Sequence, residues 1–277
     1  MTRAKPQRRP APQGQPTVNA LVRGLDILRC FNETRRVLGS SEIARLVGLP
    51  QPTVWRLCRT LVQQGYLTLE GADGRFRPGL PVLTLGFAAL STMSLAEIAR
   101  PALQELAEEL RGAACLSTRH ETSVLFLQRC EAMNALLTIN LSVGSTIPLA
   151  SSGTGWALMA ALPAGERDIV IAQLRQRDPE LWRRAEKHWR RALEDFPRLG
   201  YVINTDVFFP GLTTIAVPIR PFASQPPYTV SVTVLSSVLS AERIRREAGP
   251  RVTVAAKALE QAMGATDDTM RALQRRR

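Results

Sequence analysis

Histidine and cysteine, the side chains that most often bind transition metals, are scarce in this chain of 277 residues. It has two histidines, His120 and His188, and its four cysteines include no CxxC pair. A zinc site needs about four such ligands at close spacing, and a haem attachment needs a CxxCH run. The spacing therefore predicts no metal and no cofactor. Isolated cysteines in apolar contexts favour buried thiols in a reducing cytoplasm.

Three catalytic signatures are also absent, namely GxSxG, GxxxxGK[ST] and HExxH. The sequence accordingly favours a protein that is not an enzyme, and no catalytic residue is assigned. One alternative stays open at this point. A Ser-His-Asp site assembles from residues far apart in the chain, so spacing alone leaves a small-molecule hydrolase conceivable.

Membrane and export signals are missing as well. Residues 1–17 are rich in Arg, Pro and Gln and lack the apolar core of a secretory signal, which predicts a disordered basic arm. Residues 78–96 carry no charge but contain Pro78, Pro81 and Gly86, which make a poor membrane span. We expect a cytoplasmic protein with no membrane partner.

Positive charge is plentiful and unevenly distributed. Residues 1–79 hold 13 Lys/Arg and 5 Asp/Glu, a balance of +8, whereas residues 80–277 hold 23 and 19, a balance of +4. The asymmetry favours a polyanionic partner for the N-terminal part. A GC-rich coding bias would explain why 33 arginines accompany only three lysines, but it would not explain the asymmetry.

The N-terminal part has the order helix, short helix, turn, helix, hairpin. Apolar residues recur at helical spacing over residues 18–31, and Ser40 and Ser41 stand where an N-cap of the next helix belongs. Residues 48–50 break that short helix. A further helix covers residues 51–64, and a tight turn at residues 71–74 joins two strand-like runs, YLTLE and RFRPG. This order is typical of a winged helix-turn-helix, residues 18–79.

The helix over residues 51–64 has one apolar stripe and one basic face. We expect Pro52 at the first helical position and Gln51 at the N-cap. Opposite the stripe lie Arg56 and Arg59. The stripe holds Val54, Leu57, Cys58 and Leu61.

In a helix-turn-helix the N-terminal part of the second helix meets base edges in the major groove. Arg56 is the leading base reader, because a guanidinium binds guanine O6 and N7 together, and Arg59 is expected on phosphate. The alternative is a merely solvated basic face, and Trp55 is open between packing and DNA contact. In the wing, Phe76 should turn inward and its neighbours outward. The predicted DNA-contacting residues are Ser40, Gln51, Thr53, Trp55, Arg56, Arg59, Arg75 and Arg77.

The remainder alternates strand-like and helical runs. Residues 80–110 are helical in pattern, with Pro101 as an interruption, and are read as a linker helix at 80–94 followed by the first helix of a second domain, 95–277. The helical runs are GWALMAAL, ERDIVIAQLRQR and residues 241–263. The strand-like runs are ACLSTRH, SVLFLQRC, LLTINLS, TIAVPIR and YTVSVTVLS. The fold class is α+β, with an antiparallel sheet in the second domain.

Residues 132–165 contain no charged side chain across 34 positions, yet they are rich in Gly, Ser and Thr. Such a composition suits a buried wall of backbone amides and small hydroxyls. In SSGTGW the glycines permit close backbone approach, and the helix that follows directs its N-terminal amides at a guest, for which a carboxylate is the natural choice. A tight turn before a core helix is the alternative.

Taken together, several stretches resemble the IclR family of bacterial transcriptional regulators. The resemblance covers nearly everything from Val18 onward and is carried by residues 18–32, 40–67, 73–86, 143–163 and 199–219. It implies a winged helix-turn-helix, a linker helix and a GAF-like effector-binding domain. It also implies homodimers or homotetramers on double-stranded operator DNA beside catabolic genes.

The resemblance further implies where a small organic acid binds. Gly153 and Thr154 match the turn whose amides meet the effector carboxylate. Other pocket positions fall at or near Asp206, Thr214, Thr233 and Leu235. The chain departs from the family at Val207, which replaces an acidic residue, at Thr214, often a cysteine, and at Leu235, commonly a small hydroxyl residue.

Apolar neighbours of that pocket favour an aromatic or otherwise hydrophobic carboxylic acid over a glyoxylate-sized one. The candidate neighbours are Leu136, Leu137, Ile139, Phe208, Phe209 and Leu235. The sequence thus predicts a ligand-responsive, DNA-binding transcriptional regulator, repressor or activator. A non-regulatory nucleic-acid-binding architectural protein is the runner-up, although it would have no evident use for the large C-terminal domain.

Overall fold

The computed structural model describes residues 18–32, 34–71, 74–91, 95–134, 141–220 and 227–274. The chain divides into two compact units, Met1–Thr92 and Met93–Arg277. The arm predicted for residues 1–17 and the last three residues of the predicted linker lie outside the described residues. No helix in the described part of the chain combines the length and apolarity that crossing a membrane requires.

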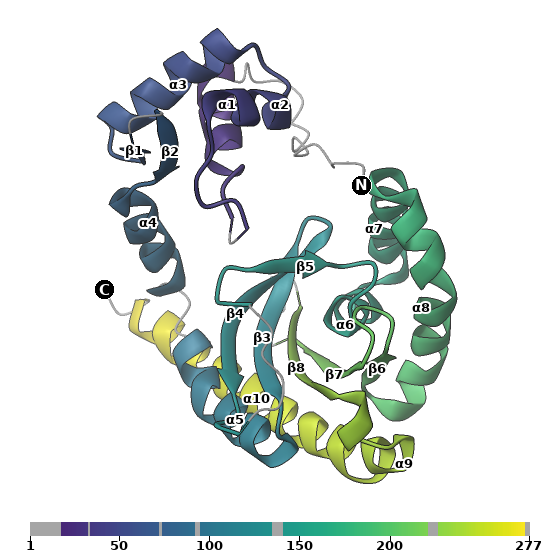
Figure 1. The fold of residues 1–277 in the computed structure, drawn as a ribbon. Coiled ribbons are helices and arrows are strands. Elements are labelled where there is room, and N and C mark those ends of the chain that lie inside the picture. The colour runs from purple at the N-terminus through teal and green to yellow at the C-terminus, as the bar shows by residue number, and fades with distance from the viewer. Residues whose placement is uncertain are drawn as a thin grey trace. The chain divides into compact units, whose positions relative to one another are not determined.

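The first unit has the predicted order of elements (Figure 1). Its elements are α1 (Asn19–Leu28), α2 (Ser40–Val47), α3 (Gln51–Gln63), β1 (Leu67–Glu70), β2 (Arg75–Pro78) and α4 (Leu80–Ser91). A small core joins the three helices to the wing through fully buried Ile27, Ile43, Val54 and Phe76. The apolar stripe predicted on α3 is confirmed, since Val54 and Cys58 are fully buried and Leu57 and Leu61 pack against them.

The start of α2 differs from the prediction by one residue. Gly39, not Ser40, is the N-cap, and Ser40 is the first helical residue. The Glu42 carboxylate accepts a hydrogen bond from the Gly39 amide at 2.8 Å. An acidic side chain in the first turn thus pairs with a backbone amide that has no partner within the helix. Gly48 ends α2 in the left-handed conformation, at φ 70°, where a side chain would be strained.

The start of α3 also differs by one residue. The Val54 amide donates to the Pro50 carbonyl at 3.1 Å, which makes Pro50 the N-cap instead of Gln51. Gln51 and Pro52 therefore occupy the first two helical positions. Neither position needs an amide donor within the helix, so Pro52 fits there without loss of a hydrogen bond.

The wing is wider than the two predicted strands. β1 and β2 pair antiparallel, with Leu69 opposite Phe76. Leu38, in the segment before α2, adds a bridge on the other side of Phe76, and the two residues exchange both backbone hydrogen bonds at 2.9 Å. Phe76 is fully buried while Arg75 and Arg77 are exposed, which confirms the predicted alternation.

The second unit is an α+β domain with a six-stranded antiparallel sheet in the order β5-β4-β3-β8-β7-β6. Its strands are β3 (Ala113–His120), β4 (Ser123–Glu131), β5 (Thr146–Pro148), β6 (Val202–Thr205), β7 (Leu212–Ile219) and β8 (Tyr228–Leu235). Its main helices are α5 (Leu95–Leu110), α6 (Gly153–Ala160), α7 (Ala164–Arg177), α8 (Pro179–Leu199) and α10 (Gly249–Gln274). Between β8 and α10 come η1 (Ser236–Val238), α9 (Ala241–Arg243) and the π-helical η2 (Ile244–Ala248).

Helices cover both faces of this sheet, and the sheet curls around α6 (Figure 1). One face packs against α5 and α10 in a core that includes Leu103, Leu116 and Val252. The other face packs against α6, with α7 and α8 beyond it, in a second core that includes Trp156 and Trp189. Four of the five predicted strands are confirmed, whereas most of LLTINLS lies outside the described residues.

Pro101 does not interrupt the helical pattern as predicted. It lies inside α5, which runs without a break from Leu95 to Leu110. The Pro101 side chain lies on the exposed side of α5, whereas Ala99 and Leu103 are fully buried on the opposite side. The packing of α5 on the sheet therefore compensates for the hydrogen bond that proline cannot donate.

All four thiols are free and buried. Burial raises the pKa of Cys30 to about 11, of Cys58 to about 12 and of Cys115 to about 11, and it also raises the pKa of Cys130. The reactive form of a thiol is the thiolate, so each thiol is protonated and inert at pH 8.

We expect the native protein at pH 8 to react with a thiol reagent such as Ellman's reagent at least about a hundredfold more slowly than the protein in guanidinium chloride, where the thiols regain an ordinary pKa. The measurement is the absorbance change with time. Rapid labelling of even one native cysteine would contradict the buried positions.

Candidate DNA-reading surface and ligand pocket

The exposed face of α3 carries two arginines without ionic partners. Arg56 and Arg59 are exposed, one turn apart, and neither side chain makes an ion pair or hydrogen bond within the described part of the chain. Other arginines of the first unit form ion pairs, for example Arg29 with Asp26 at 3.7 Å. Two unpaired guanidinium groups on one helical face form a surface ready to bind an anion.

The N-termini of α2 and α3 are tied together at this surface. The Gln51 amide nitrogen donates to the Ser40 hydroxyl at 3.1 Å. Thr53 is half-buried in the same first turn of α3. Ser40, Gln51 and Thr53 therefore lie beside the two arginines, in the part of the helix-turn-helix that approaches DNA.

The wing arginines have partners within the protein. Arg75 Nη2 donates to the Val37 carbonyl at 3.2 Å and to the Glu42 carboxylate at 3.1 Å, which ties the wing to α2. Arg77 lies 3.8 Å from the Glu70 carboxylate across the hairpin. Both pairs are solvent-exposed and worth little in stability, so they orient the side chains more than they hold the fold.

Trp55 packs against the wing. Its ring lies 5.6 Å from that of Phe76, tilted by 59°, and it borders Gly74 in the turn of the hairpin. It nevertheless remains 39% exposed, so one part of the indole packs and another part faces solvent. The tertiary structure thus gives Trp55 a packing role that the sequence left open.

A small cavity lies between α6 and the curled sheet in the second unit. It is lined by both apolar and polar side chains from widely separated segments. The lining residues are Cys115, Phe126, Arg129, Leu141, Ile147, Ser152, Thr154, Asn204, Phe208, Phe209, Leu212, Thr214, Ser231 and Thr233. Its volume is about 30 Å³, on the order of the space that a water or two would fill.

The polar wall of the cavity is a set of mutually bonded hydroxyls. Thr154 donates to Ser231 at 3.3 Å, and Thr214 and Thr233 share a hydrogen bond of 2.9 Å. Ser152 caps α6 by accepting from the Gly155 amide at 3.1 Å. The first-turn amides of Gly153 and Thr154 lie at the same helix end, where the helix dipole favours an anion.

Gly153 occupies a position with no room for a side chain. A β-carbon there would come within 2.8 Å of Asn204 Cβ and 3.2 Å of Thr214 Cβ. As predicted, this glycine allows a close approach of the backbone: it brings the start of α6 against β6 and β7. The start of α6 is held directly against the strands that line the cavity.

Arg129 lines the cavity and was missed by sequence analysis. Its side chain is only 7% exposed, pairs with Glu131 and lies 3.8 Å from the Cys115 sulfur. Strict alternation from Phe126 would have placed Gln128 on this face. A bulge in the β3–β4 pairing shifts the pattern by one residue, so Gln128 reaches α5 on the opposite face and Arg129 faces the cavity.

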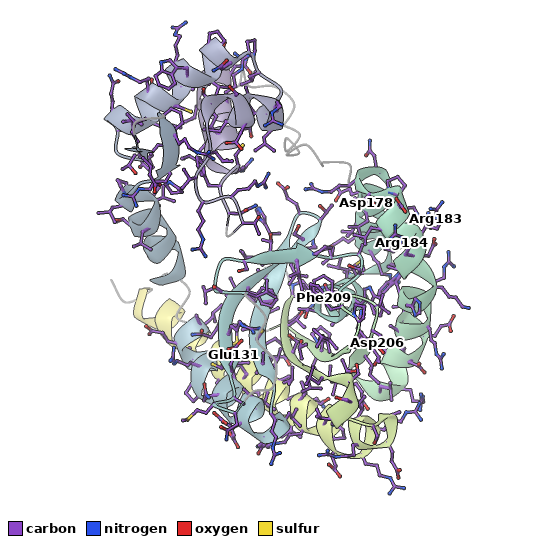
Figure 2. The ribbon with its side chains drawn as sticks, viewed as in Figure 1. Glu131, Asp178, Arg183, Arg184, Asp206 and Phe209 are labelled. Atoms are coloured by element: carbon purple, nitrogen blue, oxygen red, sulfur yellow. The ribbon has the colours of Figure 1, made fainter. Side chains whose placement is uncertain are left out.

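Three of the predicted pocket residues, Gly153, Asp206 and Leu235, are not among the described residues that line the cavity, whereas Thr154, Thr214 and Thr233 are. Asp206 has φ 61° and accepts hydrogen bonds from the Gly211 amide at 2.7 Å and the Ser236 hydroxyl at 3.1 Å. It thereby joins the two ends of the loop that carries Phe208 and Phe209. Asp206 and Phe209 are labelled in Figure 2. Leu136, Leu137 and Ile139 lie outside the described residues.

Apolar side chains form the rest of the lining. Phe208 and Phe209 pack edge to face, with ring centroids 4.6 Å apart, and Phe126 and Ile147 come from β4 and β5. No three His, Cys, Asp or Glu side chains gather as metal ligands in the described ranges. The cavity combines an aromatic wall, a buried cation and a helix N-terminus.

The IclR helix-turn-helix domain model matches residues 20–71, and the model of the bacterial transcriptional regulator IclR C-terminal domain matches residues 87–261. The chain belongs to the IclR family. It is 31% identical over 238 residues to the HTH-type transcriptional regulator TsaQ1/TsaQ2 of Comamonas testosteroni, covering 86% of this chain and 85% of that protein.

Two solved structures extend the likeness. An IclR family regulator from Brucella abortus matches with a TM-score of 0.82 at 33% identity, covering 91% of this chain and 96% of that one. An IclR homologue from Microbacterium hydrocarbonoxydans, solved with 4-hydroxybenzoate, matches with a TM-score of 0.66 at 26% identity, covering 86% of this chain and 99% of that one.

Membership of the IclR family decides between the alternatives that the sequence left open. The protein is a transcriptional regulator with a DNA-binding helix-turn-helix, as its relatives are, and not an enzyme. The hydrolase and the architectural-protein alternatives are both set aside. The fold class predicted from the sequence is confirmed.

Proposed function

We propose that this IclR-family regulator binds operator DNA through α3 and the wing, and releases or engages it when an aromatic carboxylic acid enters the cavity beside α6. We place it in the cytoplasm, where its DNA is, and at genes for the catabolism of such acids. The observation that carries the proposal is the lining of the cavity, which joins an aromatic wall to the buried Arg129 guanidinium.

DNA recognition rests on the unpaired arginines of α3. Arg56, nearer the N-terminus, reads a base edge, and Arg59 holds phosphate one turn further along. Ser40 and Gln51 position the two helix N-termini against the backbone of the duplex. Arg75 and Arg77 on the exposed side of β2 contact a flanking phosphate, and their exposed ion pairs exchange for it at small cost.

The effector chemistry follows from the two ends of the cavity. Once the cavity has opened, an aromatic ring packs against Phe126, Phe208 and Phe209, whereas a glyoxylate-sized acid is too small to cover these three rings. The carboxylate meets the first-turn amides of Gly153 and Thr154 or the Arg129 guanidinium. The homologue solved with 4-hydroxybenzoate supports the same class of ligand.

Ligand entry requires movement, because the cavity of about 30 Å³ is smaller than a benzene ring. The loop that carries Phe208 and Phe209 is the wall that can open outward, since both residues are only partly buried or exposed. A ligand that binds one arrangement of this loop better than another shifts the population between them. This shift is the signal that the effector unit transmits.

We further propose that the protein acts as a homodimer, or as a pair of dimers. Exposed apolar side chains gather on two helices of the first unit, with Leu21 63% exposed on α1 and Leu80 and Leu83 79% and 70% exposed on α4. Helical faces of this kind are typical of protein interfaces. A twofold dimer would present two copies of α3 to the half-sites of an operator.

We expect Arg56→Ala to cost roughly 1–3 kcal/mol of operator binding and to relax the preference at one base pair. Arg59→Ala should weaken all sequences about equally, because phosphate carries no sequence information. The measurement is fluorescence anisotropy with operator variants at two salt concentrations. If Arg56→Ala weakens every sequence alike, Arg56 does not read a base.

We expect isothermal titration calorimetry to show benzoate or 4-hydroxybenzoate binding more tightly than glyoxylate or pyruvate. Arg129→Gln should weaken the aromatic acid by roughly tenfold, the usual cost of losing one charged hydrogen bond. Arg119→Gln, on the neighbouring strand and outside the cavity lining, is the control and should leave affinity unchanged. Tight glyoxylate binding with no benzoate binding would refute the aromatic effector.

We expect Leu83→Glu combined with Leu21→Glu to reduce the molecular mass measured by light scattering toward that of the monomer, or of a smaller oligomer, and to weaken operator binding. Charges buried at an apolar interface are costly. Leu69→Glu, an exposed leucine on β1, is the control for oligomeric state. An unchanged mass would place the interface elsewhere.

A further inference from the structure

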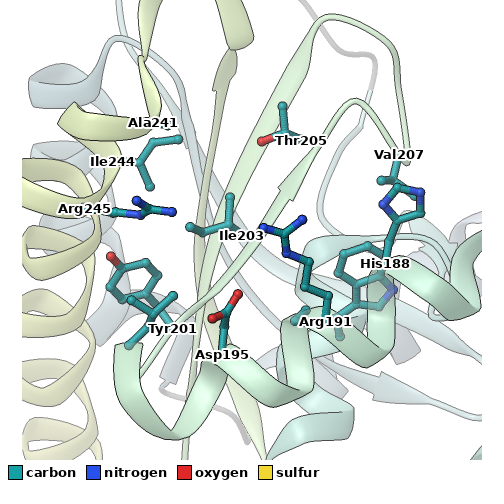
Figure 3. A pocket seen from close by; sticks show the side chains of 13 residues that line it. His188, Arg191, Asp195, Tyr201, Ile203, Thr205, Val207, Ala241, Ile244 and Arg245 are labelled. Atoms are coloured by element: carbon teal, nitrogen blue, oxygen red, sulfur yellow. The ribbon is translucent and has the colours of Figure 1, made fainter.

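A second and larger cleft lies on the opposite side of β6 from the effector cavity. Its volume is about 310 Å³, within the range of small-molecule sites. One wall is α8, the floor is Tyr201, Ile203 and Thr205, and the other wall is α9 with η2 (Figure 3). Asn204, between Ile203 and Thr205, faces the effector cavity instead, so successive residues of one strand line two different cavities.

The cleft contains two cations without ionic partners. Arg191 from α8 and Arg245 from η2 point toward each other from opposite walls, and Ile203 lies between them in the view of Figure 3. Within the described ranges neither side chain makes an ion pair or a hydrogen bond. Asp195, the carboxylate in the lining, pairs with Arg198 at 3.0 Å and with neither of the two cleft arginines. Two guanidinium groups and one carboxylate thus face the cleft, which leaves it with an excess of positive charge.

The neighbours of these arginines behave differently. Arg190 pairs with Glu186 at 2.8 Å, and Arg246 pairs with Glu242 at 3.2 Å. Both lie outside the lining of the cleft. Adjacent arginines on the same two elements are thus neutralised on the solvent side and unpaired on the cleft side, which distinguishes the cleft from a generally solvated basic surface.

Tyr201 supplies a hydroxyl donor at the floor. Tyr201 is 4% exposed, and its ring packs directly against the backbone of Gly249. A β-carbon at Gly249 would lie 2.2 Å from Tyr201 Cζ, so only glycine leaves room for the ring. Burial raises the pKa of Tyr201, and the charges of Arg245 and Arg198 oppose that rise. At neutral pH the Tyr201 hydroxyl is therefore protonated and can donate a hydrogen bond to an anion. His188, from α8, also lines the cleft.

The backbone of the second wall is unusual. Ile244–Ala248 form a π-helical segment between α9 and α10, and Arg245 projects from it. Segments of this kind are rare and often coincide with functional sites, because the widened turn reorients a side chain. Here Ile244 packs into the core while Arg245 reaches the cleft.

We propose that this cleft is a second ligand site for a small organic dianion, such as a dicarboxylate or a phosphate ester. Arg191 and Arg245 each bind one charged group or share a phosphate, and Tyr201 donates a hydrogen bond. Guanidinium forks suit both carboxylate and phosphate. Because β6 lines both cavities, occupancy of the cleft changes the affinity of the effector cavity. This coupling, unlike the binding itself, rests on the proposed function.

Calorimetry on the full-length protein tests the binding with succinate and with glycerol 3-phosphate as probes, and butyrate as the monoanionic control. We expect at least one dianion to bind and butyrate to bind much more weakly; the probe that binds identifies a dicarboxylate or a phosphate source. Arg191→Gln and Arg245→Gln should each weaken it roughly tenfold or more. Arg190→Gln and Arg246→Gln should stay within about twofold.

Two results would overturn the site. One is no binding of either dianion by the native protein. The other is an equal loss in Arg190→Gln and Arg191→Gln, which would show nonspecific attraction to α8. Thermal unfolding of each variant confirms that it is folded, and Tyr201→Phe gives an independent check, with a several-fold loss expected from one missing hydrogen bond.

The coupling is tested by repeating the benzoate titration with the cleft saturated by the dianion that binds. A shifted benzoate affinity that returns to normal in Arg245→Gln supports coupling through β6. An unchanged affinity would show that the two cavities are independent. If benzoate does not bind at all, the proposed effector is wrong, but the dianion titrations and their four arginine variants still decide the cleft.

Discussion

The close approach of the α6 N-terminus to the sheet is the constraint on which the effector unit depends. A β-carbon at Gly155 would lie 2.3 Å from the Leu149 carbonyl, and one at Gly153 would clash with β6. Trp156, fully buried just behind them, donates to the Ala150 carbonyl at 2.7 Å and locks the turn. Because the helix sits this close, its first-turn amides and the strand hydroxyls border the same small cavity.

The strand β6 lies between the effector cavity and the cationic cleft. It is an edge strand, paired only with β7, and α8 packs along it. Its alternation sends Asn204 toward α6 and Ile203 toward the cationic cleft. A four-residue strand with a cavity on each side can link two binding events, since a shift in either cavity must be accommodated by the same backbone.

In the DNA-binding unit the corresponding constraint is the attachment of the wing. Phe76 is fully buried, paired through its backbone with Leu38 and in tilted ring contact with Trp55, and Arg75 adds a link to α2 through Glu42. The wing therefore moves with the helices. The apolar stripe of α3 is occupied by this core, which leaves its opposite face, with Arg56 and Arg59, for recognition.

Periodicity in the sequence determined the order of elements, the winged helix-turn-helix and the exposed basic face of α3, because these depend on contacts between residues close in the chain. Helix starts were misplaced by one residue at Gly39 and Pro50, where a Glu42 cap and a proline carbonyl decided the boundary. Only the tertiary structure could place Arg129, because a β-bulge reverses the alternation that the sequence suggests. The same holds for Arg191 and Arg245, which are 54 positions apart in the chain and line one cleft only because α8 and the π-helical turn form its two walls.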